Sequence, residues 1–117
     1  MKIKPILPSL REKKRYLAFE VISKSRINSF NDVSESINQN CRQFIGDLGM
    51  SQAGILILED KWNPQLQKGI LKVSHKSVDR IKASLSLIKN IKEEEVIIRS
   101  VGLSGILKKA QNKYMAS

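Results

Sequence analysis

The residue types that catalyse reactions are sparse in this sequence and are not arranged as a catalytic centre. The chain has one histidine, His75, and one cysteine, Cys41, so paired cysteines cannot hold zinc, and neither a metal site nor a catalytic triad at His75 is favoured. Glu93, Glu94 and Glu95 are consecutive, and neighbouring residues of a strand point to opposite faces. We interpret them as solvated loop residues and His75 as a surface residue at a helix entry. We predict no catalytic residue.

Two pairs of carboxylates are spaced closely enough to hold a divalent cation. They are Asp32 with Glu35, and Glu59 with Asp60. Oxygen ligands of this kind suit Mg²⁺, but such pairs also arise often by chance. We therefore predict no metal site and no cofactor bound by the protein itself.

A glycine-rich segment, Gly102-Leu103-Ser104-Gly105, follows a predicted strand and precedes a predicted helix. Backbone amides at the start of a helix can hold a phosphate. The segment lacks the Gly-Lys-Ser/Thr ending of a P-loop and is not a GxGxxG fingerprint. Two interpretations stay open, a phosphate-binding turn and a flexible turn capped by Ser104.

The charge of the chain is concentrated in its two ends. The 117 residues include 21 Lys and Arg against 11 Asp and Glu, a formal charge of +10. Residues 1–15 hold six basic side chains and one acid, and residues 103–117 hold three lysines and no acid. Binding a polyanion releases counterions from each phosphate that is neutralised. The pattern therefore favours a nucleic-acid partner over an anionic membrane surface.

Length and composition indicate a single domain over residues 1–117. The chain is 41% hydrophobic, which is enough for one core. A lone cysteine cannot form an internal disulfide, which indicates a reducing compartment. No apolar run approaches the roughly 20 residues of a membrane span. We expect a cytoplasmic protein that does not bind membranes.

Hydrophobic periodicity predicts alternating strands and helices. Pro5 and Pro8 favour a basic, extended arm over residues 1–14. Leu17, Phe19 and Val21 alternate as in a half-buried strand. Ser29 and Asn31 are cap-type residues, Ser29 with Asp32 three residues later, before a helix that we expect to close at Gly46 or Gly49. The predicted elements are strand 16–22, helix 29–48, strand 53–58, strand 69–73, helix 76–88, strand 96–101 and a basic helix over 103–115.

The order β-α-β-β-α-β predicts an α+β fold, a ferredoxin-like or RRM-like α/β sandwich with an antiparallel sheet and an extra C-terminal helix. The two main helices should cover one face of the sheet. RNA-binding modules of this fold stack bases on aromatic residues of the first and third strands, but here the third strand, residues 68–73, has aliphatic side chains at the positions where the stacking rings belong. Recognition of phosphates or shape is therefore favoured over reading of base sequence.

Two blocks of the sequence resemble a known family. Residues 5–23, which include Leu7-Pro8-Ser9-Leu10-Arg11-Glu12-Lys13-Lys14-Arg15-Tyr16, and residues 96–109, with their Gly-Leu-Ser-Gly turn and basic helix, resemble archaeal ribonuclease P protein component two. This is the family of small ribonuclease P and MRP protein subunits. Compatible spacings between the blocks extend the resemblance over essentially the whole chain.

The resemblance implies a non-catalytic subunit of ribonuclease P, the endoribonuclease that removes the 5′ leader of precursor tRNA. In that family the RNA subunit performs the chemistry with Mg²⁺. The small protein pairs with a TIM-barrel-like ribonuclease P protein subunit, as a heterodimer or heterotetramer, and helps the RNA to fold. Two alternatives stay open: a ferredoxin-like regulatory or ligand-binding module with basic solubilising ends, and a protein-only nuclease, for which the sequence lacks clustered acids and histidines.

We predict two groups of contact residues. Those expected to bind RNA phosphates or backbone are Arg11, Lys13, Lys14, Arg15, Arg99, Ser104, Lys108 and Lys109. Those expected to meet a partner protein are apolar side chains of the uncovered side of the sheet or of the hairpin, namely Trp62, Ile22 and Ile57. Trp62 leads this group because a large aromatic residue at a loop tip rarely belongs to the core.

Overall fold

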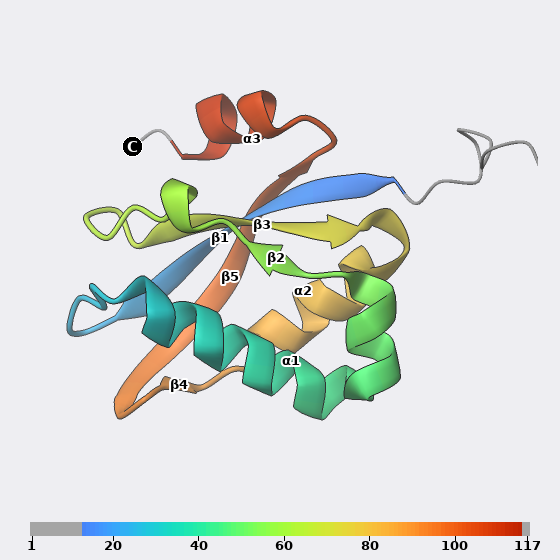
Figure 1. Ribbon diagram of the computed structural model, residues 1–117. Helices are drawn as coiled ribbons and strands as arrows, with labels where there is room; N and C mark the ends of the chain where they lie inside the picture. The colour runs from blue at the N-terminus through green and yellow to red at the C-terminus, as the bar shows by residue number, and fades with distance from the viewer. Residues whose placement is uncertain (1–12, 116–117) are drawn as a thin grey trace, which may run out of the picture.

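The computed structural model describes residues 13–115, which form an antiparallel sheet with helices on both faces (Figure 1). Residues 1–12 of the predicted arm over residues 1–14, with Arg11, lie outside the described residues, and Lys14 belongs to the first strand. The strands are β1 (Lys14–Ser23), β2 (Leu56–Ile57), β3 (Lys68–Ser74), β4 (Asn90–Ile91) and β5 (Glu94–Ser104). The helices are α1 (Phe30–Ala53), α2 (Val78–Ser86) and α3 (Leu107–Tyr114), with 3-10 turns η2 (Glu59–Lys61) and η3 (His75–Ser77).

The strands lie in the order β2-β3-β1-β5-β4, and every neighbouring pair is antiparallel. Without β4, this order is that of the ferredoxin-like fold, so the predicted fold class is confirmed. The short strand β4 was not predicted. It consists of Asn90 and Ile91, which pair with Glu95 and Glu94, and two residues are too few to show a periodic pattern.

The main core lies between the sheet and helices α1 and α2. Leu17, Phe19 and Val21 alternate along β1 as predicted, and they are 0%, 0% and 3% exposed. They pack with side chains of both helices, such as Ile37 and Ile81. Each side chain of this size contributes about 1.5–3 kcal/mol when it is fully buried. The core therefore fixes β1, whose first residues carry the predicted RNA contacts.

Helix α3 covers part of the opposite face of the sheet (Figure 1). Ala18 of β1, Ile70 of β3 and Ala110 of α3 form a second buried cluster. Tyr16, Leu107 and Tyr114 are among the partly buried residues that pack around it. The C-terminal helix is thus attached to the central strands of the sheet.

The predicted end of the first helix is wrong. Of the two cap-type residues, Ser29 is the N-cap, with the Asp32 N–H donating to Ser29 Oγ at 3.3 Å. Gly46 adopts φ 75° and ψ 173° and kinks the helix, but the chain resumes helical geometry until Gly54 caps it in the left-handed conformation. Ala53 is consequently helical, and the predicted strand 53–58 shortens to Leu56–Ile57.

The boundary between the last strand and the last helix also differs from the prediction. We expected the strand to end before Gly102 and the helix to start at Leu103. Instead β5 continues to Ser104, because β1 offers pairing partners up to Tyr16, and α3 starts at Leu107. The glycine-rich segment is therefore mostly strand rather than a turn that opens directly into a helix.

Candidate nucleic-acid interface

The two basic ends of the described chain meet at one end of the sheet. Tyr16 of β1 pairs with Ser104 of β5, and a Cβ atom built on Gly105 would lie 3.6 Å from Arg15 Nη1. Lys108 and Lys109 follow Gly105 in the first turn of α3. Figure 1 shows the start of β1 beside the loop that leads into α3. We call Lys13, Lys14, Arg15, Lys108 and Lys109 the cation cluster.

Several charges of the cation cluster are not neutralised by the protein. Lys13, Lys108 and Lys109 are exposed, and Arg15 is half-buried. None of these four makes an ion pair with an acid among residues 13–115. An unneutralised group of cations attracts phosphates, because their counterions are released on contact. This surface is suited to the phosphate backbone of a nucleic acid.

Backbone hydrogen bonds fix the start of β1. The His75 N–H donates to the Lys13 carbonyl at 2.8 Å, and His75 Nδ1 lies 3.2 Å from the same oxygen. Arg15 Nη1 donates to the Lys14 carbonyl at 3.1 Å. His75 lies in the 3-10 turn η3 directly before α2, in agreement with its interpretation as a helix-entry residue. The turn therefore anchors the strand that carries the N-terminal cations.

Arg99 lies away from the cation cluster. It pairs with Glu20, which is four residues beyond Tyr16 along β1, a separation of about 13 Å at the usual rise of a strand. Arg99 Nε lies 2.7 Å from Glu20 Oε1, so a carboxylate offsets its charge. The structure does not bring Arg99 together with the terminal cations, and its contact with RNA stays a prediction.

The Ser104 hydroxyl closes the turn before α3. Ser104 Oγ accepts from the Ile106 N–H at 3.1 Å and donates to the Ile106 carbonyl at 3.1 Å. These bonds favour a structural turn over a phosphate-binding turn. Ser104 does not cap the helix itself, because the N-cap of α3 is Ile106. A contact between Ser104 and RNA stays a prediction.

Two of the three residues predicted to meet a partner protein are not freely exposed. Ile57 is only 8% exposed and belongs to the main core. The Trp62 ring stacks on Phe19, with ring centroids 6.3 Å apart, because the connection between β2 and β3 folds back over Gly69. The expectation that Trp62 stands out from a loop tip is therefore wrong.

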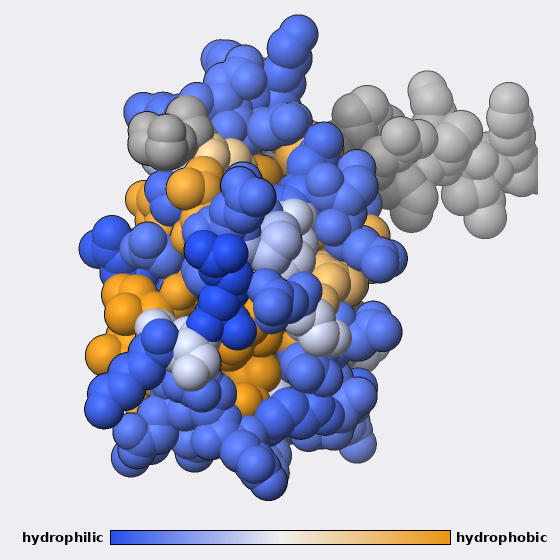
Figure 2. Space-filling model, turned by 90° about the vertical axis from the view of Figure 1, so that its left-hand side faces the viewer, coloured by the Kyte–Doolittle hydropathy of each residue, from blue (hydrophilic) through white to orange (hydrophobic). Residues whose placement is uncertain are grey.

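Ile22 is the one member of that group with an open side chain. It is 45% exposed and lies opposite Ile97, which is 63% exposed. Figure 2 shows hydrophobic patches between hydrophilic side chains at the end of the molecule where β1 ends. A contact between Ile22 and another protein stays a prediction.

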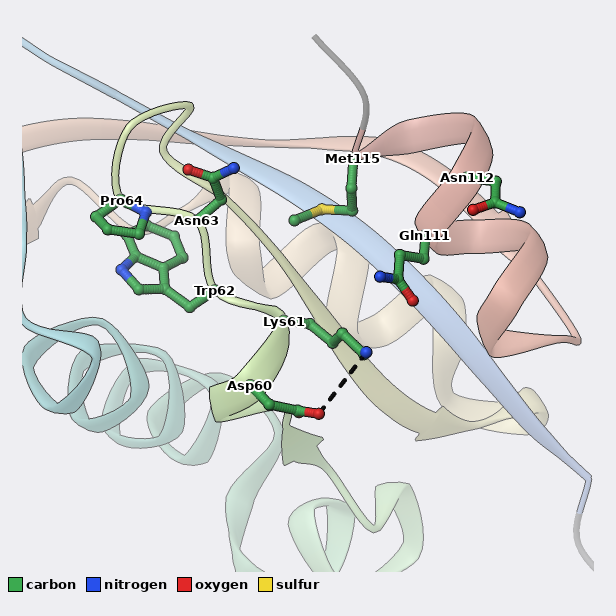
Figure 3. A pocket seen from close by; sticks show the side chains of 8 residues that line it. All are labelled: Asp60, Lys61, Trp62, Asn63, Pro64, Gln111, Asn112 and Met115. Carbon is green, nitrogen blue, oxygen red and sulfur yellow. Dashed lines mark ion pairs between the residues drawn. The ribbon is translucent and has the colours of Figure 1, made fainter.

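A cavity that the sequence did not indicate lies between the β2–β3 connection and α3 (Figure 3). Its volume is about 480 Å³. Asn63 contributes to one wall and Gln111 to the other. Because these residues are far apart in the sequence, no local pattern connects them, and only the packing of α3 on the sheet brings them together.

Two titratable groups outside the cation cluster have shifted pKa values. Burial raises the pKa of the Cys41 thiol from 9.0 to about 11, against a smaller opposite effect of a hydrogen bond with Ser84. The hydrogen bond between Lys92 and Glu35, 2.7 Å long, raises the pKa of the exposed Lys92. Since the thiolate is the reactive form of cysteine, Cys41 is a core residue rather than a nucleophile.

Groups of metal-ligating side chains are absent from the described part of the chain. Among residues 13–115, no three His, Cys, Asp or Glu side chains lie close enough to hold a metal ion. Asp32 and Glu35 are on the same helix, but the Glu35 carboxylate pairs with Lys92. Within the same residues, no helix has the length and apolar character needed to cross a bilayer.

The fold and the cation cluster define a class of protein, a small ferredoxin-like α+β domain with a basic surface at one end of its sheet. Residues 15–115 match the model of the Rpp14/Pop5 family. The chain belongs to this family, which confirms the resemblance seen in its sequence.

Curated relatives named "Ribonuclease P protein component 2" match almost the whole chain. The protein of Pyrococcus furiosus is 33% identical over 97% of this chain and 92% of its own length. That of Methanosarcina mazei is 34% identical over 97% and 93%. A chain in a cryo-EM structure of yeast ribonuclease MRP has the same fold, with a TM-score of 0.64 over 81% of this chain and 76% of its own, at 13% identity.

Proposed function

We propose that this chain is a non-catalytic protein subunit of ribonuclease P, which binds and folds the catalytic RNA so that the RNA removes the 5′ leader of precursor tRNA. Curated relatives whose matches cover 97% of the chain are named "Ribonuclease P protein component 2", which supports the assignment. The observation that supports the mechanism is the approach of Arg15 to Gly105, which lies three residues before Lys108.

The proposed mechanism is electrostatic. Folded RNA brings phosphates close together, and their repulsion opposes closure around the metal ions that perform the chemistry. Arg15, Lys108 and Lys109 replace mobile counterions at such phosphates, so less Mg²⁺ is needed for the same fold. Each phosphate contact adds roughly −0.7 to −0.9 to the slope of log affinity against log salt. In this proposal the Mg²⁺ ions are held by the RNA and not by the protein.

In this proposal the chain contacts precursor tRNA only as part of the holoenzyme. The holoenzyme acts in the cytoplasm and does not bind a membrane. The protein partner is the TIM-barrel-like ribonuclease P subunit, in a heterodimer or heterotetramer. The exposed pair Ile22 and Ile97 supports a protein contact on the face of the sheet that carries α3.

The proposal is tested in a particle reconstituted from the ribonuclease P RNA and its protein subunits. The cluster variant carries Lys108→Glu and Lys109→Glu together. The control variant carries Lys82→Glu and Lys89→Glu together. The control makes the same change of charge at exposed lysines of α2 and the residues after it. We expect the cluster variant to lose at least tenfold in cleavage of precursor tRNA at limiting Mg²⁺, and the control to lose little.

Thermal unfolding of both variants shows whether each remains folded. Equal losses in the folded cluster variant and the folded control would overturn the mechanism. Cleavage that does not respond to addition of the wild-type chain would overturn the assignment as a subunit.

A further inference from the structure

The cavity between the β2–β3 connection and α3 has the size and the walls of a ligand site (Figure 3). Its volume of about 480 Å³ lies within the range of about 300–1,000 Å³ that is typical of small-molecule sites. The residues that matter here are Lys61, Trp62 and Asn63 on one side and Gln111, Asn112 and Met115 on the other. Figure 3 shows Lys61 and Gln111 extending toward each other across it.

The amide groups of this cavity retain hydrogen-bonding capacity. Asn63 Oδ1 accepts from the N–H groups of Gln65 at 2.9 Å and Leu66 at 3.1 Å. These bonds orient the Asn63 amide and leave its NH₂ group as a donor. The side chains of Gln111 and Asn112 make no hydrogen bond within residues 13–115. The cavity thus offers both donors and acceptors to a ligand.

The other walls supply one cation and apolar surface. Lys61 Nζ lies 3.7 Å from Asp60 Oδ2, and the Lys61 side chain is 21% exposed, so the ammonium is held at the cavity. Trp62, Pro64 and Met115 are the apolar residues of the lining, and Figure 3 shows the Trp62 ring beside Pro64. Such a combination matches a nucleotide, since amides can bind the edge of a base and apolar or aromatic groups its faces.

The position of the cavity on α3 connects it with the cation cluster. Lys108 and Asn112 are four residues apart on α3 and therefore lie on one face of the helix. An RNA backbone that contacts Lys108 passes within one helical turn of the Asn112 amide. We propose that this cavity binds one unpaired nucleotide of the RNA, whose base is held by the Gln111 amide, with the Asn112 amide next to it on α3. This inference rests on the proposed function.

The test separates recognition of a base from attraction of phosphates. The probes are the single-stranded hexamer r(A)₆ and an abasic hexamer with the same phosphates, each titrated with the full chain by fluorescence anisotropy. We expect r(A)₆ to bind at least fivefold more tightly. Gln111→Ala with Asn112→Ala should remove this preference without changing the affinity for the abasic hexamer or the salt dependence. Alanine is compatible with these exposed helical positions.

The matched control is Gln43→Ala, which removes an exposed helical amide from α1. We expect it to leave the preference for r(A)₆ unchanged. Equal binding of the two hexamers by the wild-type chain, no measurable binding of either, or a preference that survives the double substitution would overturn the proposal.

Binding of the ribonuclease P RNA by the wild-type chain distinguishes this failure from failure of the proposed function. If the chain binds the ribonuclease P RNA with a steep salt dependence but shows no preference for bases, only the nucleotide site is wrong. If it does not bind that RNA at all, the proposed function is wrong as well.

Discussion

The ring of Tyr114 lies directly on the backbone of Gly102, so a Cβ atom added to that glycine would overlap three carbon atoms of the ring. The Tyr114 hydroxyl also donates to the Leu103 carbonyl at 3.4 Å. Through this contact the last turn of α3 rests on β5. The places of Lys108 and Lys109 depend on it, because they belong to the same helix.

We predict that Gly102→Ala displaces α3 and weakens RNA binding. The added methyl group must push the ring away from β5, and overpacking of this kind costs about 1–3 kcal/mol. Chemical denaturation measures the loss of stability, and titration of the ribonuclease P RNA measures the loss of affinity. In a Tyr114→Ala background the same substitution should cost much less. Strictly additive losses would show that the ring and the glycine do not interact.

A second prediction concerns the ion pair of Arg99 and Glu20. Arg99→Ala should weaken RNA binding less than Arg15→Ala does, because the Glu20 carboxylate, 2.7 Å away, already offsets the charge of Arg99. Its effect on stability should stay within about 1 kcal/mol, as for most exposed pairs. Glu20→Gln should strengthen RNA binding. If Arg99→Ala costs more affinity than Arg15→Ala, the RNA lies over β5 instead of the cation cluster.

The parts of the fold that were predicted correctly depend on residues close in sequence. Leu17, Phe19 and Val21 show the alternation of a strand, and Ser29 shows the chemistry of a helix cap. The end of β5 depends on a distant partner, since Ser104 stays in the sheet only because Tyr16 is there to pair with it. The end of β5 is therefore a boundary set by long-range pairing, which a local sequence pattern could not supply.

In the candidate site, too, features set by neighbouring residues could be predicted and features set by distant contacts could not. Basic residues at the two ends are visible in the sequence, and the ferredoxin-like order places β1 beside β5, so the approach of Arg15 to Gly105 is consistent with the predicted fold. Trp62 was misjudged because its burial depends on Phe19, a residue in another strand. The cavity lined by Asn63 and Gln111 has no sequence signal for the same reason.

A third prediction uses the pKa of Cys41, which burial raises from 9.0 to about 11. The unfolded chain therefore loses this proton at a lower pH than the folded chain does. The contribution of the thiol to stability is complete below pH 9 and is lost progressively as the pH rises toward 11. Cys41→Ala should reduce the fall of unfolding free energy with pH over this range.

Alkylation of Cys41 checks the same feature directly. At pH 8 the native thiol should react with iodoacetamide far more slowly than the thiol of the chain unfolded in urea, as followed by mass spectrometry. Equal rates in the two states would contradict the burial of Cys41 on the core-facing side of α1.

The last prediction decides between two roles for Trp62. Because its ring stacks on Phe19 and packs against the main core, Trp62→Ala should lower the free energy of unfolding by about 2–4 kcal/mol. Trp62→Phe should restore part of that loss, since it keeps an aromatic ring over Phe19. The control is Ile22→Ala, whose side chain is 45% exposed and whose loss should stay near 0.5 kcal/mol. An unchanged denaturation midpoint in Trp62→Ala, together with weaker binding of the TIM-barrel-like subunit, would show that this ring serves the partner rather than the core.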